Sequence, residues 1–127
     1  YFISSFIYYK EINPTVYSTG TVNESILYMK NNLDKKLTIE ELSKQCNTST
    51  SHYIRIFKQK TGQSPIAYFN QLKIQQSCQY LYFTDKNIKQ ICLLLGFDDQ
   101  YYFSRLFTKL IGSSPSTYRK LHKGNHG

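Results

Sequence analysis

The stretch that decides the fold is a pattern that occurs twice. The first copy runs from Thr38-Ile-Glu-Glu-Leu-Ser43 to Gly62-Gln-Ser-Pro-Ile-Ala-Tyr68, and the second runs from Asn87-Ile-Lys-Gln-Ile-Cys92 to Gly112-Ser-Ser-Pro-Ser-Thr-Tyr118. The earlier parts of the two copies align at an offset of 49 residues, and the later parts align at an offset of 50. The extra residue of the second copy therefore falls after Cys46, in a polar stretch. Because turns tolerate insertions, this position indicates a structural repeat with a turn there.

Each copy predicts a helix, a short turn and a second helix. Thr38 followed by Glu41 has the spacing of a capping box at a helix start. Asn87 and Gln90 repeat that spacing in the second copy. Apolar residues at helical spacing then mark the buried face of each second helix. These residues are Tyr53, Ile56 and Phe57 in the first copy, and Phe103, Leu106, Phe107 and Leu110 in the second.

Residues that tolerate positive φ mark where the helices end. They are Asn47 and Gly62 in the first copy, and Gly96 and Gly112 in the second. After Gly62, Ser64 and Pro65 start a new helix, because Ser is a good N-cap and Pro fits the first helical position. Ser114 and Pro115 start a closing helix in the same way. For both serines the N-cap role is preferred over a phosphate contact.

These elements predict an all-α fold of about seven helices, in which a long helix over residues 65–83 connects two helix–turn–helix units. The first unit covers about residues 21–64 and the second about residues 85–122, within a domain of residues 21–127. Thr21 with Glu24 has capping-box spacing and predicts a helix to about Asn32. Residues 1–20 are interpreted as the end of a preceding domain or as a linker, with an apolar stretch at positions 2–9.

A helix–turn–helix binds DNA when the outer face of its second helix is polar and basic. The second helices of both copies are therefore interpreted as recognition helices. The outward residues expected to contact DNA are Ser51, His52, Arg55 and Lys58 in the first copy, and Gln100, Tyr101, Ser104, Arg105 and Lys109 in the second. The connecting helix of residues 65–83 would span about 28 Å. One turn of B-DNA spans about 34 Å, so the two recognition helices can enter successive major grooves.

The charge distribution points to a polyanionic partner. The 127-residue chain has a formal net charge of +8, which favours nucleic acid or an anionic membrane surface. No acidic residue lies between Glu41 and Asp85, and none follows Asp99. The second half of each copy is therefore purely basic, as expected of a phosphate-binding surface. A basic domain without such a partner is the alternative.

Residues 88–107 and 112–119 resemble, almost position by position, the C-terminal DNA-binding domain of AraC/XylS-type bacterial transcription regulators. The resemblance covers roughly residues 22–121. The chain departs from the family pattern at Cys92, where Ala is usual, and at Lys73 and Ser77, where the family usually has Arg and Ala. Ile54 stands in the first recognition helix where a polar residue is common, so a second reading has only the second unit contacting bases.

The resemblance implies a DNA-binding transcription regulator of the bacterial cytoplasm, associated with the nucleoid. It also implies a separate effector-binding or dimerisation domain before residue 21, and activation through contact with RNA polymerase. The double-stranded DNA site is expected to be asymmetric and bipartite, because the outward residues of the two copies differ.

Within this reading, Arg55 and Arg105 are the strongest candidates for base contacts. An arginine can donate a bidentate pair to guanine, which contributes roughly 1–3 kcal/mol of discrimination. Gln100 is suited to adenine, whereas Lys58 and Lys109 are expected to face phosphates. The structural alternatives are surface salt bridges for the arginines and solvated side chains for the lysines.

Nothing in the sequence indicates catalysis, a cofactor or a metal. The three cysteines, Cys46, Cys78 and Cys92, lack zinc spacing and are interpreted as small core residues in a reducing cytoplasm. No membrane-spanning run is visible. Two alternatives remain for function: a DNA-binding module fused to a repair enzyme, and a protein-interaction module whose basic charge is incidental.

Overall fold

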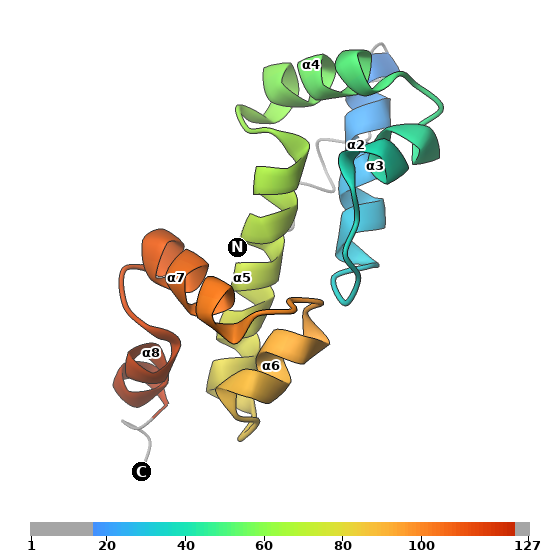
Figure 1. Ribbon diagram of the computed structural model, residues 1–127. Coiled ribbons are helices and arrows are strands. Elements are labelled where there is room, and N and C mark those ends of the chain that lie inside the picture. Colours follow the sequence, from blue (N-terminus) through green and yellow to red (C-terminus); the bar gives the residue numbers. More distant parts are fainter. Residues whose placement is uncertain (1–16, 124–127) are drawn as a thin grey trace.

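The structure is a computed structural model that describes residues 17–123 (Figure 1). Its helices are α2 (Tyr17–Lys30), α3 (Ile39–Gln45), α4 (Thr50–Thr61), α5 (Pro65–Phe83), α6 (Ile88–Leu94), α7 (Gln100–Ile111) and α8 (Pro115–His122). Seven helices and no strand occur within this described range, which confirms the predicted all-α fold. The apolar stretch at positions 2–9 lies outside it.

The structure contains the local hydrogen bonds that were expected to define the helix boundaries. Thr38 Oγ1 accepts from the Glu41 amide at 3.1 Å, and Glu41 Oε1 accepts from the Thr38 amide at 2.8 Å. Asn87 and Gln90 form the same reciprocal pair in the second copy. Asn47, with φ of +57°, is the one non-glycine residue of the described chain in the left-handed region. Both capping boxes of the repeat are therefore confirmed.

The N-terminal boundary of α2 differs from the prediction. The helix begins at Tyr17, so residues 17–20 form its first turn and are not a linker. Thr21 lies inside the helix, and the predicted capping box with Glu24 is wrong. A Thr-x-x-Glu spacing also occurs along a helix interior, where it carries no boundary information. The fully buried Val22 and Met29 stabilise this helix and outweigh the cost of about 1 kcal/mol for the helical Gly20.

Each unit contains four helices, α2–α5 in the first and α5–α8 in the second, and α5 belongs to both units. The fully buried residues of α2 recur on α5 at an offset of 52 residues: Val22, Ser25 and Met29 match Ile74, Ser77 and Leu81. Helices α2, α3 and α4 therefore correspond to α5, α6 and α7. Figure 1 shows the two units stacked along α5, which closes the first unit and opens the second.

Two hydrophobic cores follow from this arrangement. The first contains Val22, Ile26, Met29, Leu42, Tyr53, Ile56, Phe57 and Phe69. The second contains Ile74, Leu81, Ile91, Cys92, Leu95, Phe97, Phe103 and Phe107. Leu33, in the turn after α2, packs against both cores. Five of the seven predicted inward residues of the recognition helices are buried, whereas Leu106 is only partly buried and Leu110, in the last turn of α7, is 44% exposed.

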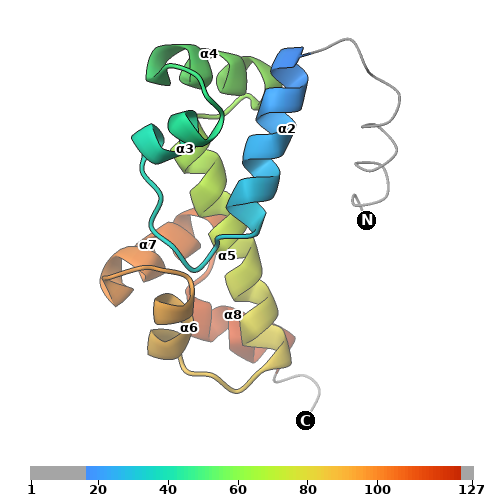
Figure 2. The same cartoon turned by 90° about the vertical axis from the view of Figure 1, so that its right-hand side faces the viewer.

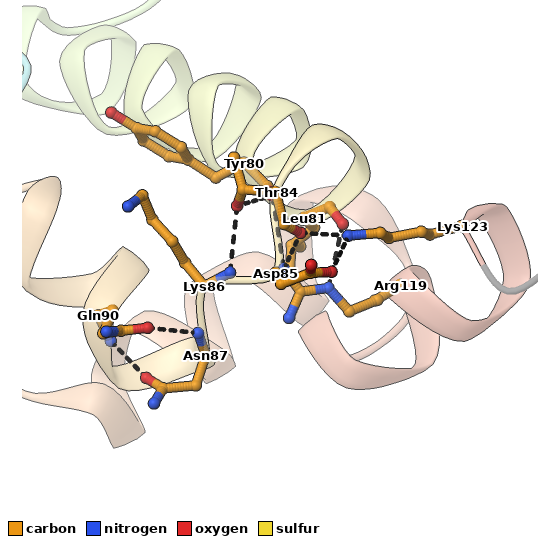
Figure 3. Close-up of polar contacts among 9 residues, drawn as sticks. All are labelled: Tyr80, Leu81, Thr84, Asp85, Lys86, Asn87, Gln90, Arg119 and Lys123. Atoms are coloured by element: carbon orange, nitrogen blue, oxygen red, sulfur yellow. Dashed lines mark hydrogen bonds and ion pairs between the residues drawn. The ribbon is translucent and has the colours of Figure 1, made fainter.

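Helix α8 closes the second unit by capping the C-terminal end of α5 (Figure 3). The guanidinium of Arg119 donates to the carbonyl oxygens of Leu81 at 3.0 Å and Thr84 at 2.9 Å. The ammonium of Lys123 donates to the Thr84 carbonyl and, at 2.6 Å, to the Asp85 carboxylate. The last carbonyls of a helix have no partner within it, and cations stabilise that end. Arg119 and Lys123 therefore stabilise the fold, although the charge pattern of the sequence groups them with the basic residues expected to bind phosphate.

Replacing Arg119 with Met is expected to lower the free energy of unfolding by about 1–3 kcal/mol, because the carbonyls at the end of α5 lose charged donors. Lys120→Met, at an exposed neighbouring position, is expected to change it by less than about 0.5 kcal/mol. Urea denaturation of both variants provides the measurement. Equal losses in the two variants would contradict the capping role.

Candidate nucleic-acid interface

The first recognition helix, α4, is anchored through its inner face. Tyr53, Ile56 and Phe57 are buried in the first core. The Tyr53 hydroxyl also lies 2.5 Å from the Ser25 hydroxyl of α2, and neither residue is exposed. Burial raises the pKa of Tyr53 to about 12, and the hydrogen bond with Ser25 opposes this rise. The inner face thus fixes α4 on α2 and leaves the opposite face to solvent.

The second recognition helix, α7, is anchored by hydrophobic packing in the second core, in which aromatic rings take a large part. Phe103 occupies the position that Tyr53 has in the first copy, and its ring lies 5.2 Å from Phe97. Phe107 meets Tyr118 of α8 edge-to-face at 5.7 Å. The counterpart of Ser25 is Ser77, whose hydroxyl donates to its own helix instead. Both recognition helices are therefore packed through their inner faces, and α4 adds a buried hydroxyl pair with α2.

The predicted contact residues lie on the outer faces of α4 and α7. Ser51, His52, Arg55 and Lys58 are exposed on α4, and Gln100, Tyr101, Arg105 and Lys109 are exposed on α7. Ser104 and Ile54, which occupy equivalent positions, are half-buried. Each set lies on a single helix, and the structure places the two sets at different levels of α5. Figure 2 shows α4 and α7 on the left-hand side of the molecule at these two levels.

On α4, Arg55 is held by His52. The guanidinium nitrogen Nη2 lies 2.8 Å from His52 Nδ1. Because a guanidinium has no acceptor, Nδ1 must accept, and the neutral imidazole then carries its proton on Nε2. Both side chains consequently present N–H donors. Such donors match the acceptor-rich edge of guanine in the major groove.

On α7, Arg105 is held by Tyr101. The guanidinium carbon lies 5.4 Å from the centre of the Tyr101 ring, within the range of a cation–π contact. A shallow hollow follows this outer face, lined by Tyr101, Tyr102, Ser104, Arg105, Leu106, Thr108 and Lys109. Tyr102 and Thr108 line this hollow but are not among the predicted contact residues. The repeat itself identifies Tyr102, because it is the counterpart of His52 at the offset of 50.

Among residues 17–123, no three His, Cys, Asp or Glu side chains gather where they could hold a metal ion. No helix in this range is both long enough and apolar enough to cross a membrane. Asp99 is the N-cap of α7, accepting from the Tyr101 amide at 2.9 Å, and this bond explains an acid beside a basic face.

Known proteins share both the sequence pattern and the fold. Residues 42–121 match the family model described as Helix-turn-helix domain. The chain is 41% identical over 100 residues to the MmsAB operon regulatory protein of Pseudomonas aeruginosa, covering 79% of this chain and 33% of that protein. It is 33% identical over 96 residues to the bifunctional transcriptional activator/DNA repair enzyme AdaA of Bacillus subtilis, covering 76% of this chain and 46% of that protein.

The chain belongs to the AraC/XylS family. A solved neighbour shares its fold: the DNA-binding domain of AdpA, in complex with a target DNA, has a TM-score of 0.79 at 21% identity, over 83% of this chain and 95% of that one. The chain spans between a third and a half of the two curated relatives. The helices described above are thus an AraC-type DNA-binding domain.

The anchor of α4 yields a stability prediction. Tyr53→Phe is expected to cost about 1–3 kcal/mol at pH 7, because the Ser25 hydroxyl stays buried without its partner. Adding Ser25→Ala is expected to recover part of that loss. Because folding raises the pKa of Tyr53, this residue adds to the free energy of unfolding below pH 10, and that contribution is lost as pH rises from about 10 towards about 12. Tyr53→Phe has no phenol to ionise, so its stability should not show this decline. Urea unfolding at pH 7 and above pH 10 measures both effects, and equal losses in the single and double variants would argue against the anchor.

Proposed function

We propose that this AraC-type domain binds an asymmetric, bipartite site in double-stranded DNA, with α4 and α7 in successive major grooves. The proposal rests on one observation: α4 and α7 each present an exposed, basic face, and both helices belong to units that contain α5. The 19 residues of α5 span about 28 Å, against about 34 Å for one turn of B-DNA. Slight bending of the DNA would bring both grooves into place.

The proposed asymmetry rests on the different residues at equivalent outward positions. Arg55 and Arg105 match at the offset of 50, but their neighbours do not. His52 supports Arg55 by a hydrogen bond, whereas Tyr101 supports Arg105 through its ring. Gln100 adds an amide suited to adenine at the start of α7, the end of a recognition helix that meets base edges. The two blocks of the site should therefore differ in sequence.

Lysines on the same helices are proposed to set the position of the domain on the DNA. Lys58 and Lys109 are exposed in the last turns of α4 and α7. A lysine at such a place is suited to phosphate, which orients the protein without reading sequence. This division of labour assigns specificity to the N-terminal halves of the recognition helices and salt-dependent affinity to their C-terminal halves.

For the whole protein we propose transcription regulation, with activation through contact with RNA polymerase and a further effector-binding or dimerisation domain. The curated relatives support this proposal by name, since one is an operon regulatory protein and the other a transcriptional activator. The second relative is also a DNA repair enzyme, which favours a fused repair activity as the second candidate. An assay of DNA repair activity on the full-length protein tests this second candidate.

Selection from a random duplex library is expected to yield two short blocks about one helical turn apart. Arg55→Ala should abolish preference at one block and Arg105→Ala at the other, each weakening binding by about 5- to 150-fold, the equivalent of 1–3 kcal/mol. Both arginines are exposed, so circular dichroism should show the variants folded. A single-block motif would mean that only one unit reads bases, and Ile54 would then mark the silent unit.

Lys58→Ala is expected to weaken binding to all sequences alike and to reduce the slope of log K against log salt by about 1. Salt titration on the selected duplex measures this slope. Weak binding that is insensitive to salt, with no sequence enriched, would reject the DNA-reading proposal and favour the protein-interaction module.

A further inference from the structure

The two units meet at a contact that is separate from both recognition helices. The turn after α2 lies against the turn between α6 and α7, over the middle of α5. We call this contact the inter-unit clasp and define it by Asp34, Lys36, Lys73, Gly96 and Asp98. Four of these residues come from the two turns, and Lys73 comes from α5 between them.

Lys73 is the centre of the clasp and is only 3% exposed. Its ammonium donates at 2.6 Å to the carbonyl of Lys35 in the first unit and at 2.6 Å to the carbonyl of Leu95 in the second. The same nitrogen lies over the rings of Phe69 at 4.6 Å and Phe97 at 5.2 Å, again one from each core. A buried cation is costly without such partners, so its position requires both units to stay in place.

Gly96 shows how closely the turns approach. A Cβ atom at this position would lie 2.9 Å from the Asp34 carbonyl oxygen and 3.0 Å from Lys73 Nζ. Gly62 and Gly112 have similarly positive φ, yet a Cβ atom there would meet nothing within 4 Å. The absence of a side chain at Gly96 is therefore required by the neighbouring unit as well as by its own φ of +74°.

An ion pair at the surface completes the clasp. Lys36 of the first unit pairs with Asp98 of the second, and both side chains are exposed. An exposed pair contributes little by itself. Its position nevertheless matters, because Asp98 directly precedes Asp99, the N-cap of α7. The first unit is thus linked to the start of the second recognition helix.

We propose that the inter-unit clasp fixes the distance and rotation between α4 and α7, and so makes the domain selective for the spacing between the two blocks of its DNA site. This inference rests on the proposed bipartite function. One additional base pair moves a block by about 3.4 Å along the duplex and turns it by about 34°. A rigid pair of recognition helices cannot follow that change, whereas a pair joined only by loose packing on α5 could adjust.

The test uses duplexes that carry both selected blocks at the selected spacing, or with one base pair removed or added. The wild type is expected to bind the selected spacing about tenfold or more tightly than the altered spacings, because misplacing one block should cost as much as a mismatched base pair. Gly96→Ala and Lys73→Met are expected to reduce that preference to within about threefold, while binding to a duplex with a single block stays unchanged. A purely structural loss would weaken binding to all duplexes alike.

Gly62→Ala is the matched control, because it imposes the same left-handed strain in open space. It is expected to keep the spacing preference. Full spacing preference in folded Gly96→Ala and Lys73→Met variants would overturn the inference, and so would an equal loss in Gly62→Ala. A selected motif without two blocks would instead overturn the proposed function, so the two failures are distinguishable.

Where Gly96→Ala does not fold, Lys73→Met carries the test, and where Lys73→Met does not fold, Lys73→Gln, which keeps a polar group at this buried position, replaces it. Residual dipolar couplings then provide a readout without DNA. In the wild type, a single alignment tensor is expected to fit the amides of both units, and in a clasp variant the two units are expected to need separate tensors. One tensor that fits both units in every clasp variant would overturn the inference.

Discussion

Helix α5 is the constraint on which the rest of the structure depends, because it supplies buried side chains to both cores. Phe69 packs in the first core, and Ile74 and Leu81 pack in the second. Neither core can form completely without this helix. Its length therefore sets the approximate separation of the two units, and the inter-unit clasp is proposed to fix the exact distance and rotation between α4 and α7.

The arrangement around α5 divides the positive charges into two groups with different roles. Lys73 donates to the carbonyls of Lys35 and Leu95 in the turns beside α5, and Arg119 donates to carbonyls at the C-terminal end of α5. Arg55 bonds to His52 and Arg105 lies over the Tyr101 ring, each on its own helix, and both arginines remain exposed. The difference follows from geometry, since helix ends and tight turns leave carbonyls that need donors. Net charge alone overstates the charge available to DNA.

Much of the fold could be predicted because its signals are local. A capping box forms hydrogen bonds between residues that are three positions apart, and a positive φ is favoured by single residues such as Gly and Asn. Both signals can therefore be read from the linear sequence. The limits of α5 and the outward faces of α4 and α7 follow from such signals. The start of α2, the exposure of Leu110 and the burial of Lys73 could not be predicted in this way. Each of these features depends on contacts between elements that are distant in the sequence, or on where a hydrophobic core ends.

The internal repeat adds an argument about function that neither copy contains alone. Equivalent inward positions preserve shape, as with Phe57 and Phe107, while the outward positions around the matched Arg55 and Arg105 differ in chemistry. The supports of the two arginines, an imidazole on α4 and a phenol ring on α7, restrict the guanidinium groups in different ways. A hydrogen bond fixes direction, whereas a ring face permits sliding. The first unit should accordingly be the more selective at its arginine position, and the second the more tolerant.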